Sequence, residues 1–255
     1  MFMTVRGWEI IRHARVVIST LLVVGAAQAA SAQSQASGVT YPQMAPGAEY
    51  LMQDRAAEIS LARSAAPAAI SASATVLVLS SKGYETAVKG TNGFTCLVER
   101  AWMSPFDHPQ FWNPKLRGPV CYNPAATRSI LPITRYRTKL AQSGVSKDQM
   151  FDEIRAATAR KELPAPEAGA MSFMMSKDGY LGDGIGHWHS HLMFYVAGTD
   201  VASWAANLPG SPVVVDDEHH KIPEQEVIFL VPVSHWSDGS FAPASGHAAE
   251  GGDKH

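Results

Sequence analysis

Residues 76–102 read VLVLSSKGYETAVKGTNGFTCLVERAW and decide the fold expected for this chain. A β-branched and aliphatic run at 76–79 is followed by strand patterns at 84–88 and 94–102. Between the last two stands Asn92-Gly93, a pair that tolerates positive φ and is typical of tight hairpin turns. The segment therefore predicts three strands in an antiparallel meander.

Three helices are expected outside this segment, each marked by a start or stop signal. Proline cannot donate a backbone hydrogen bond, so it opens or ends helices, and Ser or Asn caps a first turn. The predicted helices are residues 46–65 before Pro67, residues 124–142 after an Asn123 cap with an interruption or a kink at Pro132, and one opened by a capping box of Ser146 and Gln149.

The remaining pattern gives the fold class. Residues 103–122 carry four prolines among aromatic side chains and are expected to form a long ordered loop, and further strands are predicted at 170–175, 187–196 and 226–233. Strands, then helices, then strands, without regular β-α-β alternation, favour an α+β fold. We predict a mainly antiparallel sheet with helices packed on one side.

The N-terminus is typical of an export signal. Three arginines precede an apolar run at 16–27, and Ala30-Ser31-Ala32 fits a cleavage site. The run is shorter than the roughly 20 residues that span a bilayer, so we expect a periplasmic or secreted protein with no membrane span after cleavage. The predicted divisions are a signal peptide at 1–32, a flexible leader at 33–45, a single domain at 46–236 and a disordered tail at 237–255.

The charge of the chain argues against a nucleic-acid partner, and its cysteines indicate a disulfide. The formal net charge is −2, the basic residues are scattered, and removal of residues 1–32 makes the chain more acidic, so no nucleic-acid partner is expected. Cys96 and Cys121 are the two cysteines, and an oxidising compartment predicts a disulfide between them. The alternatives are two buried thiols or ligands of a soft metal.

The clearest chemical signal is an alternation of histidines. In an extended segment, His187, His189 and His191 project to one face, while Leu192, Phe194 and Val196 fill the other. Imidazole is a common metal ligand, and an H-x-H pair occurs in many zinc sites. We predict a metal site at His187, His189 and His191, in which a pair of them binds zinc or copper.

Further ligands and a reaction can be suggested for this site. His235 and the acidic and histidine cluster at 216–220 are candidate ligands if the last strand pairs beside the histidine strand. Glu99 or Glu218 could serve as general base if the ion activated a water for hydrolysis. No catalytic residue is assigned, and whether the chain is an enzyme stays open.

A non-catalytic binding function is the alternative interpretation of the same histidines. The histidines can be polar surface or pocket lining of a periplasmic binding or interaction domain without metal, and the partner would be an unknown small molecule or protein. Tryptophan and phenylalanine side chains could form a platform for a sugar or an apolar ligand, although most such residues pack in cores.

Four motifs together are similar to a family of bacterial predicted exported proteins. They are residues 94–100 (FTCLVER), 111–116 (FWNPKL), 187–191 (HWHSH) and 236–239 (WSDG). The resemblance covers nearly all of the expected mature chain. It implies export and a single folded unit, and it carries over no activity, cofactor or catalytic residue.

Overall fold

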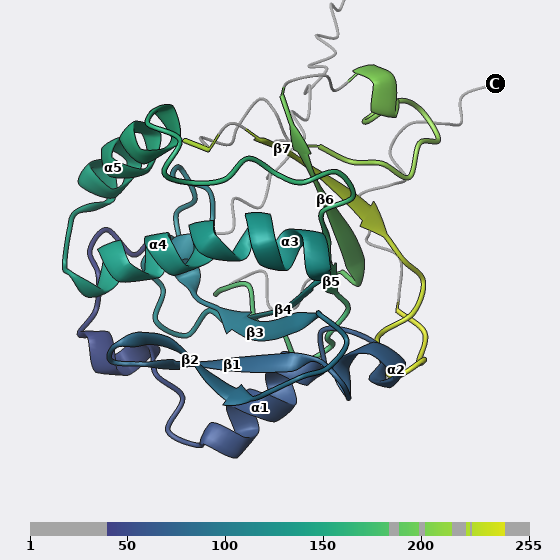
Figure 1. The fold of residues 1–255 in the computed structure, drawn as a ribbon, viewed down its shortest axis with the longest axis horizontal. Helices are drawn as coiled ribbons and strands as arrows, with labels where there is room; N and C mark the ends of the chain where they lie inside the picture. The colour runs from purple at the N-terminus through teal and green to yellow at the C-terminus, as the bar shows by residue number, and fades with distance from the viewer. Residues whose placement is uncertain (1–39, 184–188, 199–201, 216–222, 225, 243–255) are drawn as a thin grey trace, which may run out of the picture. The chain divides into compact units, whose positions relative to one another are not determined.

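The computed structural model describes residues 40–183, 189–198, 202–215, 223–224 and 226–242 (Figure 1). Its seven strands form one sheet in the order β2-β1-β3-β4-β5-β6-β7. Only β1 and β3 run parallel, and every other neighbouring pair is antiparallel. The α+β fold class with a mainly antiparallel sheet is therefore confirmed.

The elements follow the expected order of strands, helices and strands. The strands are β1 Thr75–Ser80, β2 Gly83–Val88, β3 Thr95–Glu99, β4 Gly118–Tyr122, β5 Met171–Met174, β6 His191–Ala197 and β7 Glu226–Pro232. The helices are η1 Gly47–Tyr50, α1 Arg55–Arg63, α2 Ala68–Ser71, η2 Ala101–Met103, α3 Pro124–Ser129, α4 Leu131–Gln142, α5 Lys147–Ala159 and η3 Ala202–Trp204.

The predicted meander is wrong, because β3 pairs with β1 rather than with β2. The turn at Asn92 closes a crossover past the start of β1, where Thr91 N–H donates to the Ser73 carbonyl at 2.8 Å. The Asn92 amide also donates to the Ile70 carbonyl at 2.8 Å. A Cβ at Gly90 would come within 2.1 Å of the Thr75 nitrogen, so the crossover requires glycine there.

The long helix expected at 46–65 is also wrong, because two elements share this stretch. Asp54 accepts hydrogen bonds from the backbone N–H groups of Ala56 and Ala57 at 2.8 and 3.1 Å and so caps a new helix. The segment that precedes it forms only the short η1.

The other helix signals are confirmed. Asn123 accepts from the Ala126 N–H at 2.9 Å, with Pro124 at the first helical position. The helix is interrupted where predicted, since α4 begins at Leu131 with Pro132 in its first turn. The capping box of Ser146 and Gln149 is present with both of its hydrogen bonds.

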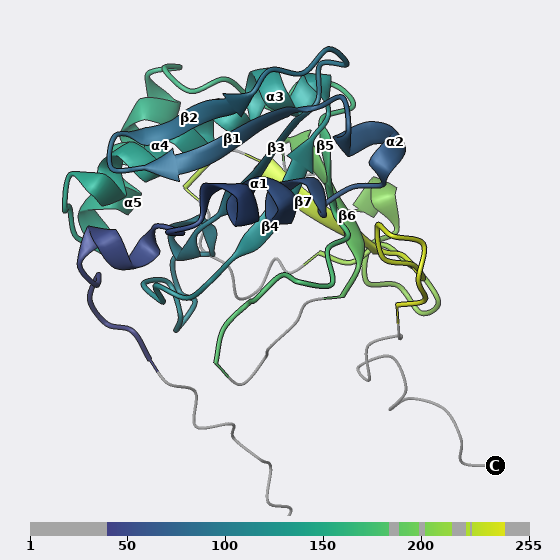
Figure 2. The ribbon, with the colours of Figure 1, turned by 90° about the horizontal axis from the view of Figure 1, so that it is seen from below.

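Different helices pack against the two faces of the sheet. Figure 1 shows α3 and α4 above the strands and α1 below them, and Figure 2 shows α1 from its own side. The main core lies between the sheet and α3, α4 and α5, while a smaller core of alanines packs α1 against β1, β3 and β4. The face that carries the smaller core is called face A here, and the opposite face is face B.

The disulfide between Cys96 and Cys121 is confirmed. The two residues lie directly opposite each other on β3 and β4, with Cα atoms 3.9 Å apart, and both are buried in the smaller core on face A. The strand β4 itself was expected to be loop because of its proline. Pro119 is tolerated because the pairing with β5 begins only at Cys121.

Residues 237–242, expected in the tail, pack against the sheet domain. The Ser237 hydroxyl donates to the Ser64 carbonyl at 2.6 Å, and Ala242, which is 4% exposed, donates its N–H to the Ser234 carbonyl. At the other end, Tyr41 of the expected leader donates its N–H to the Pro109 carbonyl at 3.1 Å. The predicted signal peptide and the tail beyond residue 242 lie outside the described residues. Within the part that is described, no helix is long and apolar enough to cross a membrane.

Candidate functional site

The histidine segment enters the sheet only at its third histidine, because β6 begins at His191. The side chain of His191 is 7% exposed and its Nδ1 lies 2.6 Å from the His189 carbonyl oxygen, whereas His189 is exposed. Burial lowers the pKa of His191 below its usual value, so its ring is neutral at pH 7. His187 lies outside the described residues.

The last strand does pair beside the histidine strand, as the ligand hypothesis required. The Ser190 hydroxyl donates to the His235 carbonyl at 2.6 Å, which brings His235 next to the segment. The His235 ring, however, lies 3.0 Å from the Ser234 hydroxyl and packs edge-on against Phe241. The cluster at 216–220 lies outside the described residues.

Among the side chains that the structure describes, no three of His, Cys, Asp or Glu are placed to hold a metal ion. Of the predicted ligands that the structure describes, His189 is exposed and His191 is buried. The zinc or copper site at His187, His189 and His191 stays a prediction that depends on His187 and on residues 216–220.

A buried polar network occupies face B beside these strands. The Tyr122 hydroxyl donates to the Glu99 carboxylate and lies 3.0 Å from the Thr134 hydroxyl, and the Tyr195 hydroxyl lies 3.0 Å from that of Ser172. Burial raises the pKa of Glu99 to about 7, while the bond from Tyr122 and the charge of Arg137 oppose that rise. A carboxyl group with such a pKa exchanges protons near neutrality, as a general base must.

Two acidic residues near the start of β7 extend this network. Arg137 of α4 binds Glu224 through both carboxylate oxygens at 2.8 Å, and both side chains are buried. Burial and the neighbouring charge of Glu224 raise the pKa of Glu226 to about 8. Glu99 and Glu224 use their carboxylates to bind other side chains of the protein, namely Tyr122 and Arg137. Such internal pairing is typical of residues that stabilise a fold.

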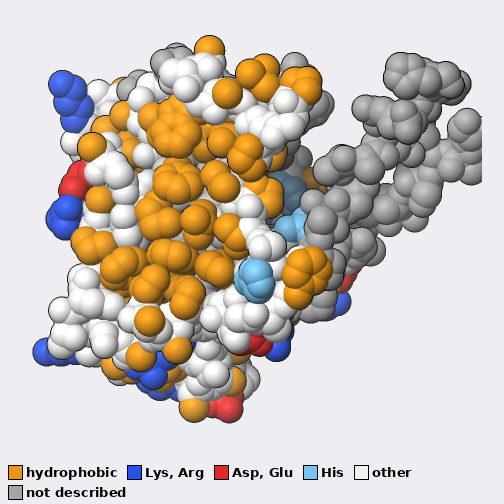
Figure 3. All heavy atoms as spheres, turned by 90° about the vertical axis from the view of Figure 1, so that its right-hand side faces the viewer, with side chains coloured by type: hydrophobic (Ala, Val, Ile, Leu, Met, Phe, Trp, Pro, Cys, Tyr) orange, Lys and Arg blue, Asp and Glu red, His pale blue; other side chains and the backbone are white. Residues whose placement is uncertain are grey.

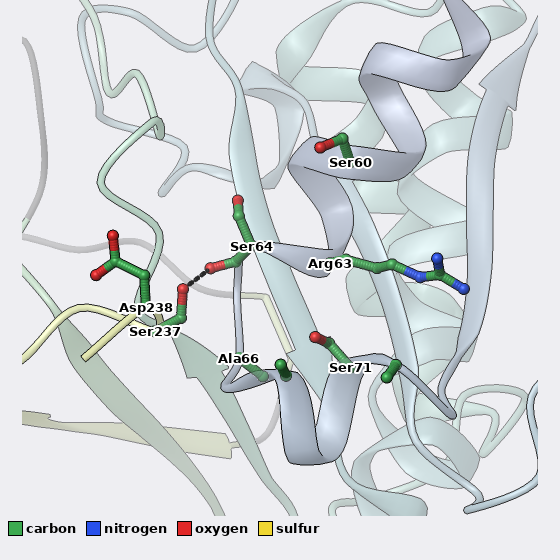
Figure 4. Close-up of a pocket in the computed structure, with 9 residues that line it drawn as sticks. Ser60, Arg63, Ser64, Ala66, Ser71, Ser237 and Asp238 are labelled. Carbon is green, nitrogen blue, oxygen red and sulfur yellow. Dashed lines mark hydrogen bonds between the residues drawn. The ribbon is translucent and has the colours of Figure 1, made fainter. Parts of the chain in front are cut away.

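An open hollow lies between α1, α2 and the turn after β7 (Figure 4). Two of the four serine hydroxyl groups that line it make bonds inside the protein: Ser237 donates to the Ser64 carbonyl, and the Ser64 hydroxyl lies 2.6 Å from that of Ser176. Arg63 extends away from Ser237 and Asp238 in Figure 4, and Asp238 is paired with Lys177 at 2.6 Å. Among the described residues that line the hollow, none is a histidine that could activate a serine.

The alternation expected in the histidine strand is present, but the sides are reversed. His191 and Tyr195 are buried on face B, where Tyr195 joins the main core. Leu192, Phe194 and Val196 alternate with them on face A and are only partly buried. The residues expected to fill the interior therefore point outward.

Face A continues as an apolar surface over three strands. Because directly opposed residues share a face, the pairings of Leu192 with Val231 and of Val196 with Val227 extend the surface onto β7. The pairings of Leu192 with Phe173 and of Phe194 with Met171 extend it onto β5. We define the apolar face as these strand residues together with Trp204, all of them partly exposed: Met171, Phe173, Leu192, Phe194, Val196, Trp204, Val227 and Val231.

Figure 3 shows this side of the molecule as a broad area of hydrophobic side chains, with Lys, Arg, Asp and Glu at its margins. Trp204 stacks on Phe229 at 4.5 Å between ring centroids and lies 6.0 Å from Phe194, so it covers the middle of β7. The smaller core under α1 includes Phe173 at its edge and stops there. On β6 and β7, the members of the apolar face join neither of the hydrophobic cores formed by the described residues.

No family model, no curated protein and no solved structure matches this chain. The resemblance to a family of exported proteins therefore stays a prediction. The site has to be interpreted from its own geometry.

Sequence reasoning missed the apolar face although the signal was present. The strands HLMFYVA and EVIFLVP are apolar at nearly every position, which is typical of strands buried on both faces. On face B, α3, α4 and α5 form the main core, whereas on face A α1 packs against β1, β3 and β4 and not against β6 or β7. A doubly apolar strand at the end of a sheet, next to strands that the helix on that face covers, is the pattern that indicates an open face.

Proposed function

We propose that this chain is an exported, non-catalytic interaction domain and that the apolar face is its binding surface. The observation that carries the proposal is the row of partly exposed apolar side chains on β5, β6 and β7, on the face of the sheet opposite the main core. Export is supported by the arginine-flanked apolar run and the cleavage pattern near residue 32.

The energetics of an open sheet face support this function. An antiparallel sheet with one solvated face normally carries polar residues there, because each large apolar side chain left in water forgoes about 1.5–3 kcal/mol of burial. Soluble monomers rarely expose contiguous apolar patches larger than a few hundred Å². Leu192, Phe194 and Val231 are partly exposed, so a partner that covers them would recover the remaining part of that burial energy.

The test places a photo-crosslinking amino acid at position 194 of the full chain in producing cells. A matched control carries it at Arg155, whose side chain is 66% exposed on α5, away from the apolar face. We expect one defined adduct from position 194 and none from position 155. The adduct should disappear when Leu192→Ser is added on the same face. Absence of any adduct specific to position 194 would overturn the proposal.

The His-centred zinc or copper site is the second candidate function. It is favoured by the bond between Nδ1 of His191 and the His189 carbonyl, because ligating histidines usually hold their second ring nitrogen in this way. Metal analysis of untagged protein tests it, with His187→Ala and His189→Ala as variants. We expect metal in the parent protein and at least tenfold weaker Zn²⁺ or Cu²⁺ binding in the variants. A parent protein that binds neither ion would remove this candidate.

A further inference from the structure

We infer that the hollow between α1, α2 and the turn after β7 binds a small carboxylate with a short aliphatic chain, held by Arg63. The inference goes beyond the proposed function, because no residue that lines the hollow belongs to the apolar face. The size of the hollow, an unpaired guanidinium, two serine hydroxyl groups and a wall of alanines favour such a ligand.

The hollow is large enough for a small molecule, and hydrogen bonds fix its walls. Its volume is about 380 Å³, within the range of roughly 300–1,000 Å³ that ligand pockets occupy. The Met175 N–H donates to the Ala65 carbonyl at 2.9 Å, and the Ser237 N–H donates to the Met175 carbonyl at 2.9 Å. The Ser237 hydroxyl also donates to the Ser64 carbonyl. Because these bonds hold the surrounding segments together, a ligand has little of the protein to order.

Arg63, the last residue of α1, brings a positive charge to the hollow. It makes no ion pair with any residue that the structure describes. Asp238, which also lines the hollow, is paired with Lys177, and Arg63 extends away from Asp238 in Figure 4. The charge on the Arg63 side of the hollow therefore favours an anion.

The donor atoms of Arg63 match a carboxylate. Arg128, Arg137 and Arg160 each bind a glutamate through Nε and Nη2, at distances of 2.7 to 3.1 Å. Arg63 has the same two donors, and its Nε is buried without a hydrogen-bond partner in the described part of the chain. Side chains commonly change rotamer when a ligand binds, so this edge can turn toward the hollow. A ligand carboxylate would then accept two parallel hydrogen bonds, as the glutamates do.

Two serine hydroxyl groups can bind the same ligand. Ser60 precedes Arg63 by three residues and is its neighbour on the surface of α1. Ser71 of α2 is 5% exposed, and in Figure 4 it lies on the side of the hollow away from Asp238. Neither hydroxyl makes a hydrogen bond to another described residue. A hydroxyl donates readily to a carboxylate oxygen, so these groups can complete the hydrogen bonds of the ligand.

Alanines give the hollow an apolar wall. Ala66, Ala68 and Ala72 line it, the last two at the start and at the end of α2. Methyl groups can bury a short alkyl chain and cannot bind a second charge. Among the described residues that line the hollow, Arg63 and Asp238 alone carry a charge, and Asp238 is negative, so a monocarboxylate fits best. Because the hollow is open, we expect a dissociation constant of roughly 0.1–10 mM.

NMR titration of the nitrogen-15-labelled full chain, as processed by the producing cells, with sodium butyrate at constant ionic strength tests this inference. We expect saturable shifts of the amides at 60–72 and 237–238. Arg63→Gln should weaken binding about tenfold or more, because it removes a charged bidentate donor. Arg55→Gln is the matched control, since Arg55 is exposed on the same helix and does not line the hollow, and it should leave the dissociation constant nearly unchanged. Dispersed amide spectra should show both variants folded, since neither arginine belongs to a hydrophobic core.

Two comparison ligands test the chemistry on the unaltered protein. 1-Butanol keeps the chain and lacks the carboxylate, so it should give no saturable shifts at 60–72. Acetate keeps the carboxylate and has a shorter chain, so it should bind more weakly than butyrate. Butanol or acetate binding as tightly as butyrate would overturn the inference. So would shifts that never saturate, shifts centred on the apolar face, or an unchanged dissociation constant in Arg63→Gln. The crosslinking test at position 194 is independent of all these outcomes.

Discussion

Arg100 is fully buried, and its guanidinium joins three parts of the chain. It donates to the Tyr50 carbonyl at 2.7 Å, to the Val98 carbonyl and to the Glu58 carboxylate at 2.8 Å. Glu58 also accepts from the Leu79 N–H at 3.1 Å, so the pair ties α1 to β1 and β3. A buried charge with this many partners is costly to leave unpaired.

Removing Arg100 should therefore destabilise the fold strongly. We expect Arg100→Met to lower the free energy of unfolding by about 3–5 kcal/mol, because the Glu58 charge remains buried without its partner. The double variant with Glu58→Leu should lose less than the single variant, since both charges are gone. Urea denaturation at pH 7 measures both. Equal losses in the two variants would show that packing, and not the unpaired charge, dominates.

Glu99 should make stability depend on pH. Its pKa is raised from 4.5 to about 7 in the folded protein, so the folded state holds a proton that the unfolded state releases above pH 4.5. The stabilising contribution is present below that value and is lost as pH rises toward 7. We expect the free energy of unfolding to fall by on the order of 2 kcal/mol between pH 4.5 and 7.5 through this group.

Urea denaturation across this pH range, compared with Glu99→Gln, checks the effect. The variant cannot titrate at this position and should show a flatter profile. The pKa of Glu226 is raised to about 8, so its share of the slope should persist in Glu99→Gln and extend to higher pH. A profile unchanged by Glu99→Gln would contradict the assignment.

At the scale of elements, the start of α5 depends on its capping box. The Ser146 hydroxyl accepts from the Gln149 N–H at 3.2 Å, and the Gln149 side chain accepts from the Ser146 N–H at 3.0 Å. We expect Ser146→Ala to cost about 1 kcal/mol of stability. Ser143→Ala is the nearby control, since its hydroxyl bonds only a carbonyl at the end of α4. Thermal unfolding distinguishes them, and a control as damaging as Ser146→Ala would argue against a specific cap.

The elements also show what the sequence could predict. Caps and proline positions act over a few residues, and the signals at Asn123, Ser146 and Pro132 are confirmed. Strand pairing is not local: Asn92-Gly93 can close a hairpin or a crossover, and its neighbours along the chain do not distinguish the two. The cap at Asp54 was not predicted, because it lies in an Ala-rich stretch that favours helix on both sides of it.

For the candidate site, too, the local pattern was predictable and the tertiary packing was not. Alternation correctly separates His191 and Tyr195 from Leu192 and Phe194, because the side-chain period of a strand is two. It cannot say which set is inside, since that depends on where helices far away in the sequence pack. The disulfide was predictable because the N-terminal pattern predicts export, and two cysteines leave a single pairing within one chain.

For the whole molecule, the disulfide joins β3 and β4, two of the strands that contribute residues to both cores. The cysteines are 25 residues apart, and closing a loop of that length should contribute about 3 kcal/mol. We expect reduction to lower the melting temperature by several degrees. The variant with both Cys96→Ala and Cys121→Ala should match the reduced protein and be insensitive to reductant. A reductant effect that persists in this variant would have to arise elsewhere.

The packing of residues 237–242 decides how the protein can be attached to a surface or label. Ala242 is held beside Ser234, just after β7, whereas Tyr41 is held at Pro109. In Figure 2 the purple start and the yellow end of the described chain lie on opposite sides of the view. A bulky label attached at position 242 would therefore crowd β7, one of the strands that form the apolar face. A label attached at position 41 would leave those strands open to whatever is passed over them.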